Sequence, residues 1–218
     1  MRVKILQKLQ YLTIFAFEME DLNLDIFNLL DNQPQPSRGS MLVAKPTVED
    51  FCFKRSVTLI VDHDNEEGSM GFMINKPTRF TINEVAPELE CNVPLPLYLG
   101  GPVGTNMLFF LHSIGSSIPE SLQVAPGLFY GGDFDMIKMY LESCEHPEDK
   151  VKFMVGYSGW AKGQLDEEVS RHDWALLKEN AAQLVFNTPD EHIWQEAVNL
   201  FGQQYRMWQN WPDDIYQN

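Results

Sequence analysis

One short segment, Gly156–Glu168, constrains the fold of this chain more than any other. It contains three glycines, a tyrosine and a tryptophan, and it lies between the apolar run Val151–Val155 and an acidic run that favours a helix. Glycine tolerates backbone angles that other residues adopt only with strain. The segment is therefore predicted to be a shaped loop that connects a strand to a helix. Trp160 within it is expected either to fill the core or to form the wall of a site.

The composition predicts an acidic globular protein that is not built to bind nucleic acid. Of its 218 residues 44% are hydrophobic, and 14 Phe and 5 Trp are enough for a substantial core. The chain carries 16 Lys and Arg against 31 Asp and Glu, which gives a formal charge of −15. Nucleic acids are bound largely through neutralisation of their phosphates, so direct nucleic-acid binding is not expected.

The cysteines and the N-terminus predict a cytoplasmic protein without a membrane segment. Cys52, Cys91 and Cys144 are widely spaced and form no C-x-x-C pair, which is typical of free thiols in a reducing compartment and gives no zinc pattern. The apolar run Tyr11–Phe17 is too short for a transmembrane helix, and acidic residues follow it where a signal peptide would be cleaved. We hypothesise that residues 1–18 are an upstream extension and that the natural start is Met19.

The chain divides into three parts. Residues 1–38 are predicted to be an N-terminal extension and linker, with an amphipathic helix over 19–30, and residues 39–207 to be the main domain. Residues 208–218 form an aromatic C-terminal tail that packs either on its own domain or into a neighbouring copy; the sequence leaves both open.

Within the main domain, strand patterns come in runs and helical patterns are grouped later, which predicts an α+β fold. Apolar runs predict strands over 41–44, 56–61, 70–74, 97–99, 108–111, 127–130 and 151–155. An apolar stripe predicts a helix over 133–144, and residues 164–171 are a shorter helical candidate. A last helix is predicted from Thr188-Pro-Asp-Glu191, which has the pattern of a capping box with proline at the first helical position.

Several motifs in a fixed order are similar to those of one known family. They are Gly39-Ser-Met-Leu-Val-Ala44, Gly68-Ser-Met-Gly-Phe-Met-Ile-Asn-Lys-Pro77, Gly100-Gly-Pro-Val103, Gly131-Gly-Asp133 and Gly156-Tyr-Ser-Gly-Trp-Ala-Lys-Gly-Gln-Leu-Asp166. In this order they resemble the bacterial YqgE/AlgH family over about residues 39–205. The resemblance implies an α+β fold built on a mixed, barrel-like sheet with a few flanking helices. Some members carry a transcriptional-regulator label. The leading segment and residues 208–216 depart from the family pattern.

Two polar clusters have both a structural and a functional interpretation. Asp62-His63-Asp64 is either a solvated turn or part of a metal site, although no spacing supplies a third ligand. Ser158 stands in Gly-Tyr-Ser-Gly, which is close to a nucleophile elbow but has Trp160 in place of the final glycine. A serine hydrolase would also need a base within hydrogen-bond reach of the hydroxyl.

Ten residues are candidates for ligand or partner binding. Asn75 and Lys76 either end a strand or face a cleft. The turn Gly100-Gly101-Pro102 either is only a tight bend or presents its backbone N–H groups to an anion. Gln164 and Glu167 lie one helical turn apart, so both could face one cleft with Tyr157. The alternative is that Gln164 only caps the following helix. The full set is Asn75, Lys76, Gly100, Gly101, Pro102, Tyr157, Ser158, Trp160, Gln164 and Glu167.

The sequence has no recognisable catalytic constellation, metal spacing or nucleotide-binding loop. The leading hypothesis is therefore a non-enzymatic cytoplasmic binding or regulatory protein that acts through a protein or small-molecule partner, with no cofactor, metal or catalytic residue assigned. The alternative is a hydrolase that uses the Tyr157–Glu167 loop. A second alternative, a transcriptional regulator, follows from the resemblance and is opposed by the negative charge.

Overall fold

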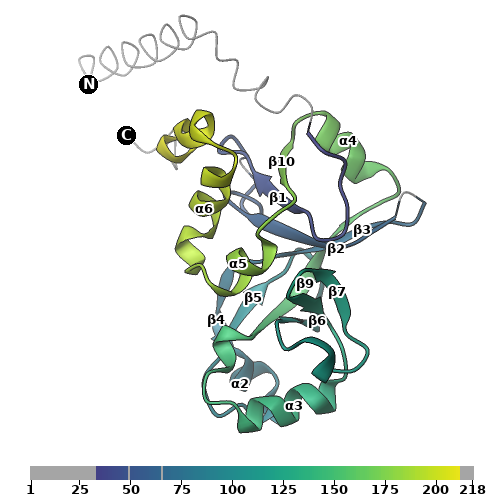
Figure 1. Cartoon of the computed structure of the whole chain (residues 1–218), viewed down its shortest axis with the longest axis vertical. Coiled ribbons are helices and arrows are strands. Elements are labelled where there is room, and N and C mark those ends of the chain that lie inside the picture. The colour runs from purple at the N-terminus through teal and green to yellow at the C-terminus, as the bar shows by residue number, and fades with distance from the viewer. Residues whose placement is uncertain (1–32, 49, 65, 212–218) are drawn as a thin grey trace, which may run out of the picture. The chain divides into compact units, whose positions relative to one another are not determined.

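The computed structural model describes residues 33–48, 50–64 and 66–211. The described residues from Pro34 onward form one compact unit, and the described residues are the part shown in colour in Figure 1. The helix predicted over residues 19–30 and the start proposed at Met19 lie outside the described residues, as do residues 212–218 of the tail.

The described residues form one mixed sheet of ten strands, with helices packed against it (Figure 1). The main path runs β10-β1-β2-β3-β9-β6-β8-β7, and β5 pairs with β9 and β4. Only the β5–β9 pair is parallel among the strand pairs of these residues. The predicted α+β fold is confirmed, but the sheet is not closed into a barrel. The strands are β1 Met41–Ala44, β2 Val57–Asp64, β3 Gly68–Met73, β4 Pro77–Thr81, β5 Pro96–Leu99, β6 Val103–His112, β7 Leu122–Ala125, β8 Leu128–Tyr130, β9 Val151–Trp160 and β10 Trp174–Leu177.

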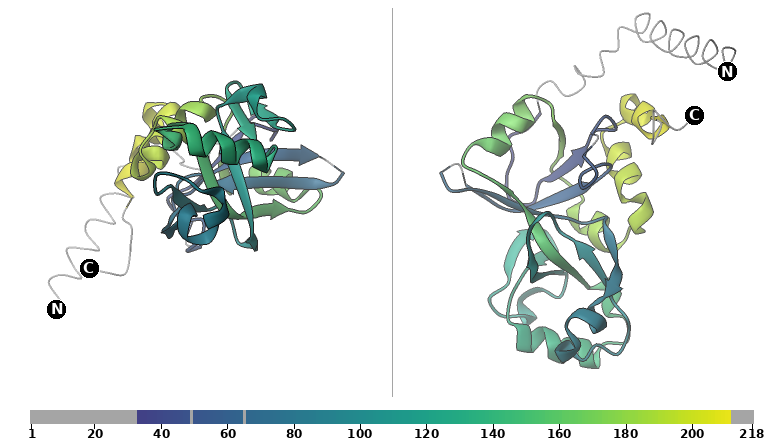
Figure 2. Two further views of the ribbon diagram at one scale, coloured as in Figure 1. Left: turned by 90° about the horizontal axis from the view of Figure 1, so that it is seen from below. Right: turned by 180° about the vertical axis from the view of Figure 1, so that it is seen from behind.

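Strand β9 connects the part of the sheet formed by β10, β1, β2 and β3 to the part formed by β6, β8 and β7, as the rear view in Figure 2 shows. Its first half pairs with β5 and β6, and its last residues pair with β3 through Ser69↔Trp160 and Gly71↔Ser158. The sequence predicted a loop from Gly156 onward, and this was wrong because β3 extends the ladder to Trp160. Gly156 (φ 69°) provides the left-handed backbone conformation at which the strand changes partners.

The helices confirm two of the predicted ranges and correct a third. They are α2 Ile82–Val85, α3 Phe134–Ser143, α4 Gln164–Ser170, α5 Ala181–Phe186 and α6 Ile193–Leu200. The last helix begins later than predicted, because a 3-10 turn, Asp190–His192, precedes α6. The capping box does not form: the Thr188 hydroxyl donates to the Gln183 carbonyl instead.

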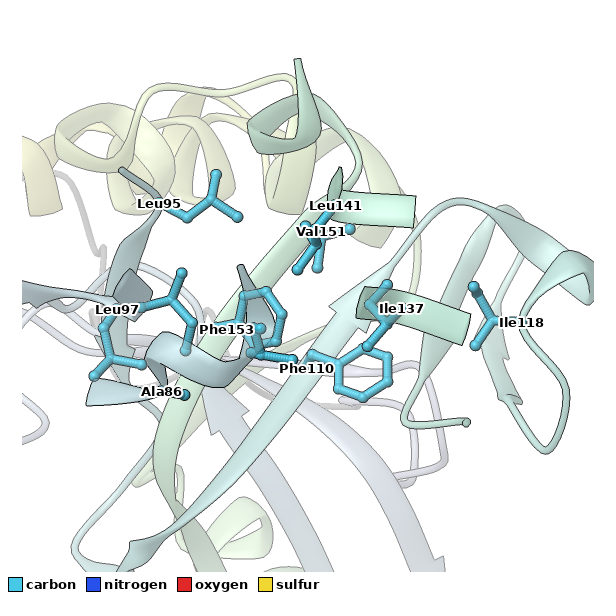
Figure 3. Close-up of a cluster of buried hydrophobic side chains, with 11 residues drawn as sticks. Ala86, Leu95, Leu97, Phe110, Ile118, Ile137, Leu141, Val151 and Phe153 are labelled. Atoms are coloured by element: carbon cyan, nitrogen blue, oxygen red, sulfur yellow. The ribbon is translucent and has the colours of Figure 1, made fainter. Parts of the chain in front are cut away.

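Two hydrophobic clusters hold the helices to the sheet. In one, Phe110 of β6 and Phe153 of β9 point toward Ile137 and Leu141 of α3 (Figure 3). In the other, Leu165 and Val169 of α4 pack with residues of β1, β2, β9 and β10, including both Trp160 and Trp174. The second cluster matters for function because it fixes the start of α4 against the end of β9.

The described part of the C-terminal tail packs on its own domain. Trp208, in the 3-10 segment Gln203–Asn210, is buried and contacts the Tyr205 ring edge-on at a centroid distance of 5.2 Å. The Arg55 guanidinium donates to the Trp211 carbonyl at 2.7 Å. Up to residue 211, these contacts favour the first of the two arrangements that the sequence left open. No helix in the described ranges is long and apolar enough to span a bilayer.

Candidate functional site

A cleft of about 490 Å³ opens where the β1–β2 connection, the β5–β6 turn, the end of β9 and the start of α4 meet. The backbone explains its position. Strand β9 ends at Trp160, the chain turns at Gly163 (φ 70°), and α4 then starts at Gln164. This short turn places the side chains of the last β9 residues beside those of the first two turns of α4.

Three aromatic side chains form the walls of the cleft. Trp160 and Trp174 are buried in the cluster that α4 covers, and both also line the cleft. The Phe53 ring meets Trp174 edge-on, with 5.6 Å between centroids. Such pairs stabilise one ring orientation, so these walls are held in place by the core.

Glu168 is the most organised polar group of the cleft. Its Oε2 accepts hydrogen bonds from the indole N–H groups of Trp160 (2.9 Å) and Trp174 (2.8 Å). Its Oε1 accepts from the Gln164 amide at 2.8 Å. Within the part of the chain that the structure describes, no basic side chain pairs with this carboxylate. A half-buried negative charge is thus oriented by three neutral donors.

The other charged groups of the lining are Asp50, Asp173 and Lys45. Asp50 accepts from the backbone N–H groups of residues 52 and 53 and so shapes the β1–β2 connection. Asp173 forms an exposed ion pair with Arg171 at 3.3 Å. Burial lowers the pKa of the Lys45 ammonium, and the nearby Asp173 opposes that shift.

Four of the ten predicted residues line this cleft: Pro102, Ser158, Trp160 and Gln164. Gln164 bridges the turn, because its Oε1 accepts from the Ala161 N–H at 3.0 Å while its amide donates to Glu168. Ser158 is buried and donates to the Gly100 carbonyl at 3.3 Å. None of the lining residues that the structure describes is a histidine, so Ser158 has no imidazole beside it in the cleft.

Gly100, Gly101 and Tyr157 are not part of the cleft lining. A Cβ on Gly101 would lie 2.2 Å from the Tyr157 carbonyl carbon, so the β5–β6 turn crosses β9 in direct backbone contact. The Gly100 N–H donates to the Val155 carbonyl at 2.9 Å and is therefore used within the fold. The Tyr157 ring packs edge-on against Phe109 rather than entering the cleft lining.

Glu167, Asn75 and Lys76 lie outside the lining. Glu167 is exposed, and its neighbour Glu168 occupies the position by the cleft. Asn75 fixes the entry to β2: its Oδ1 accepts from the Val57 N–H at 2.9 Å and its amide donates to the Arg55 carbonyl at 2.8 Å. The Lys76 ammonium donates to the Lys54 carbonyl, and burial lowers the pKa of Lys76.

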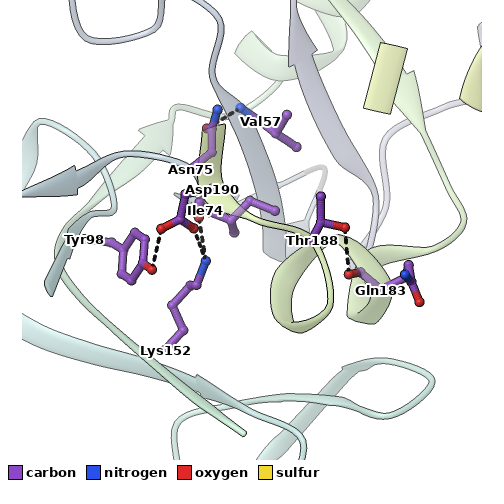
Figure 4. A network of polar contacts seen from close by, with 8 residues as sticks. All are labelled: Val57, Ile74, Asn75, Tyr98, Lys152, Gln183, Thr188 and Asp190. Carbon is purple, nitrogen blue, oxygen red and sulfur yellow. Dashed lines mark hydrogen bonds and ion pairs between the residues drawn. The ribbon is translucent and has the colours of Figure 1, made fainter. Parts of the chain in front are cut away.

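A buried polar network escaped the sequence analysis (Figure 4). The Lys152 ammonium donates to Asp190 Oδ1 and to the Ile74 carbonyl, each at 2.9 Å, and the Tyr98 hydroxyl donates to Asp190 Oδ2 at 2.7 Å. Burial lowers the pKa of Lys152, opposed by Asp190, and burial together with Asp190 raises the pKa of Tyr98 far above its ordinary value. The sequence did contain one signal for this network, namely Lys152 as a charged residue within the apolar run Val151–Val155.

The Asp62-His63-Asp64 cluster is divided among separate contacts. Asp62 pairs with Arg38 at 2.8 Å, His63 Nδ1 lies 2.8 Å from the Ser69 hydroxyl, and Asp64 accepts from two N–H groups of the following turn. Across the described ranges, no group of three or more His, Cys, Asp or Glu side chains is arranged to hold a metal ion. These contacts account for the three side chains as parts of a hairpin.

Comparisons with known proteins agree on one family. The AlgH-like family profile matches residues 41–206. A UPF0301 protein of Parabacteroides distasonis is 40% identical over 195 residues, covering 89% of this chain and 98% of that protein. A second, from Bacteroides fragilis, is 40% identical over 192 residues and covers 88% and 96%. The solution structure of the AlgH protein from Pseudomonas aeruginosa superposes with a TM-score of 0.62, at 28% identity, over 79% of this chain and 93% of that one.

A crystal structure of a protein from Corynebacterium diphtheriae has the same fold. It is 24% identical, with a TM-score of 0.66, and the match covers 84% of this chain and 96% of that one.

Proposed function

We propose a non-enzymatic ligand-binding role for this protein, which belongs to the AlgH-like family, and we assign that role to the cleft between β9, α4 and β10. The volume of about 490 Å³ lies in the range of small-molecule and side-chain sites. Three aromatic side chains line it, and the hydrogen bonds of Glu168 and Gln164 hold polar groups in place beside them, a combination found in binding sites.

One observation carries the proposal: the Glu168 carboxylate is held by the indoles of both Trp160 and Trp174. Buried indole N–H groups usually have an acceptor, and a backbone carbonyl can fill that role without a charge. Trp194 illustrates this, because its indole donates to the Ala44 carbonyl at 2.8 Å. A carboxylate used in this position gives the cleft an oriented charge that a ligand can use.

The surroundings of Ser158 favour binding over hydrolysis. A serine nucleophile needs a base within about 3.2 Å of its hydroxyl, whereas Ser158 donates to a main-chain carbonyl. His112, a conceivable base, is buried elsewhere, where its Nε2 lies 2.9 Å from the Ser121 hydroxyl and its ring stacks on Phe129. These contacts support a role in which the cleft holds its ligand without transforming it.

A thermal-shift screen tests the proposal with matched variants. The probes are cationic, neutral and anionic fragments of amino-acid size. A ligand at about ten times its Kd adds about 1.4 kcal/mol, which raises the Tm of a domain of this size by about 3–6 °C. We expect some fragments to give such shifts with the wild type and with Glu167→Gln, but not with Glu168→Gln.

The Glu167→Gln control removes the same charge from the same helix at a position outside the lining. Fragment shifts that persist unchanged in Glu168→Gln would contradict the proposal. Hydrolysis of p-nitrophenyl acetate that Ser158→Ala abolishes would favour the hydrolase instead.

A further inference from the structure

The charges of the cleft favour a cation. Its lining carries three carboxylates, Asp50, Glu168 and Asp173, against one ammonium, Lys45, for a formal charge of −2. Two of these carboxylates, Asp50 and Glu168, have no basic partner among the described residues. The whole chain has a charge of −15, so the surrounding field also attracts cations.

The chemistry of the cleft suits a cationic group. Indole and phenyl faces attract ammonium and guanidinium groups within about 6 Å, and Trp160, Trp174 and Phe53 supply such rings. A carboxylate has about four acceptor positions, of which the three neutral donors on Glu168 occupy three. The remaining one is on Oε1, the oxygen that Gln164 contacts.

Exposed apolar side chains continue this surface beyond the cleft. Phe51 lies between the lining residues Asp50 and Phe53 and is 97% exposed. The lining residue Val103 is 42% exposed. Large apolar residues grouped at a site are typical of protein-binding surfaces. A ligand of amino-acid size inside the cleft would leave them uncovered.

We propose that this cleft binds a lysine or arginine side chain of a protein partner, with apolar residues of the same partner segment on Phe51 and Val103. This inference rests on the proposed binding role and adds the chemistry of the ligand. Charge complementarity selects the occupant, since a second copy of this acidic chain would be repelled. Aromatic walls and a rigid carboxylate are the groups that recognise a basic side chain in a partly desolvated site.

The test compares two pools of short fluorescent peptides by polarisation. Both are randomised around a fixed central residue, which is arginine in one pool and citrulline, its neutral isostere, in the other. We expect the arginine pool to bind the wild-type chain at least about tenfold more tightly, as expected for a hydrogen bond to a charged group. Glu168→Gln should remove that difference, whereas Glu167→Gln should keep it.

A second variant separates the two parts of the proposed surface. Phe51→Ala should weaken binding of the arginine-pool peptides severalfold. It should leave binding of N-acetyl-arginine amide unchanged, because Phe51 lies outside the cleft. If Phe51→Ala has no effect on peptides, the ligand is a small cation and the protein-partner inference is overturned.

Equal binding of the two pools would also overturn the inference. If neither pool binds while fragments still shift the Tm in a Glu168-dependent way, the binding role stands and its assignment to a basic partner fails. Loss of the fragment effect itself would instead remove the proposed function.

Discussion

Replacing Asp190 with alanine should destabilise the fold strongly, because it leaves the Lys152 ammonium buried without its counter-charge. The side chain of Lys152 is 8% exposed and that of Asp190 is 26% exposed. Without Asp190 the ammonium keeps the Ile74 carbonyl and the Tyr98 ring face, 4.1 Å from the ring centroid. The Tyr98 hydroxyl loses its acceptor as well.

Removing one partner of a buried ion pair costs about 3–5 kcal/mol. Because Asp190 is about a quarter exposed, water can reach the vacated position, and we expect the lower end, a loss of about 3 kcal/mol. Urea unfolding followed by far-UV circular dichroism measures this loss. The double variant Lys152→Met/Asp190→Ala should be more stable than Asp190→Ala alone, since it removes the unpaired charge.

The pH dependence provides a second check on the same pair. Burial holds the folded-state pKa of Lys152 below its unfolded value, and losing Asp190 removes the interaction that opposes this shift. The unfolded chain then binds more protons between the two pKa values, so stability rises with pH toward about 10. The deficit of Asp190→Ala should therefore shrink as the pH is raised from 7 to 10. A loss below about 1 kcal/mol, or additive effects in the double variant, would refute this reasoning.

Three further changes test other parts of the fold. Burial lowers the pKa of His112 in the folded state, so the stability that the neutral ring contributes is complete above about pH 6.5 and is lost as the pH falls through the folded-state pKa. Urea midpoints should therefore fall less between pH 7 and pH 5 in His112→Asn than in the wild type. Gly101→Ala should lower the free energy of unfolding by about 1–3 kcal/mol, because the added Cβ would clash with the β9 backbone. Gly159→Ala should lower it much less in the same urea experiment, because its Cβ would meet only the Tyr157 ring edge at 3.1 Å. Trp208→Ala should lose about 3–5 kcal/mol, and an unchanged midpoint would contradict the packing of the tail.

The sequence predicted correctly several helices and strands whose own residues carry a clear hydrophobic pattern. Met41–Ala44 is a strand because four apolar residues stand between turns, and the apolar stripe of residues 133–144 predicted α3, for which Asp133 is the N-cap. β10 carries a similar run of four apolar residues, but no strand was predicted there from the sequence. Its residues Trp174–Leu177 form a strand because they pair with β1, far away in the sequence. Long-range pairing of this kind cannot be derived from a local pattern.

The candidate site was predicted in part, and the differences have physical reasons. Gln164 with either Glu167 or Glu168 satisfies the helical spacing for neighbouring side chains, so the sequence could not choose between them. The choice is made by the indoles of Trp160 and Trp174, which converge on Glu168.

Asp190 shows the same limit of local patterns. It belongs to a helix-start pattern in the sequence, but in the fold it binds Lys152 and Tyr98 from distant strands.

The most direct test of a ligand-binding cleft is the ¹H–¹⁵N spectrum of the tryptophan indoles during titration with the fragment that gives the largest thermal shift. Trp160 and Trp174 donate to Glu168 in the cleft, whereas Trp194 donates to a buried carbonyl and Trp208 is buried in the C-terminal segment. The account predicts that the Trp160 and Trp174 resonances move in the wild type and in Glu167→Gln, and that those of Trp194 and Trp208 stay fixed. Movement confined to Trp194 or Trp208, with both cleft indoles unchanged at saturation, would contradict it.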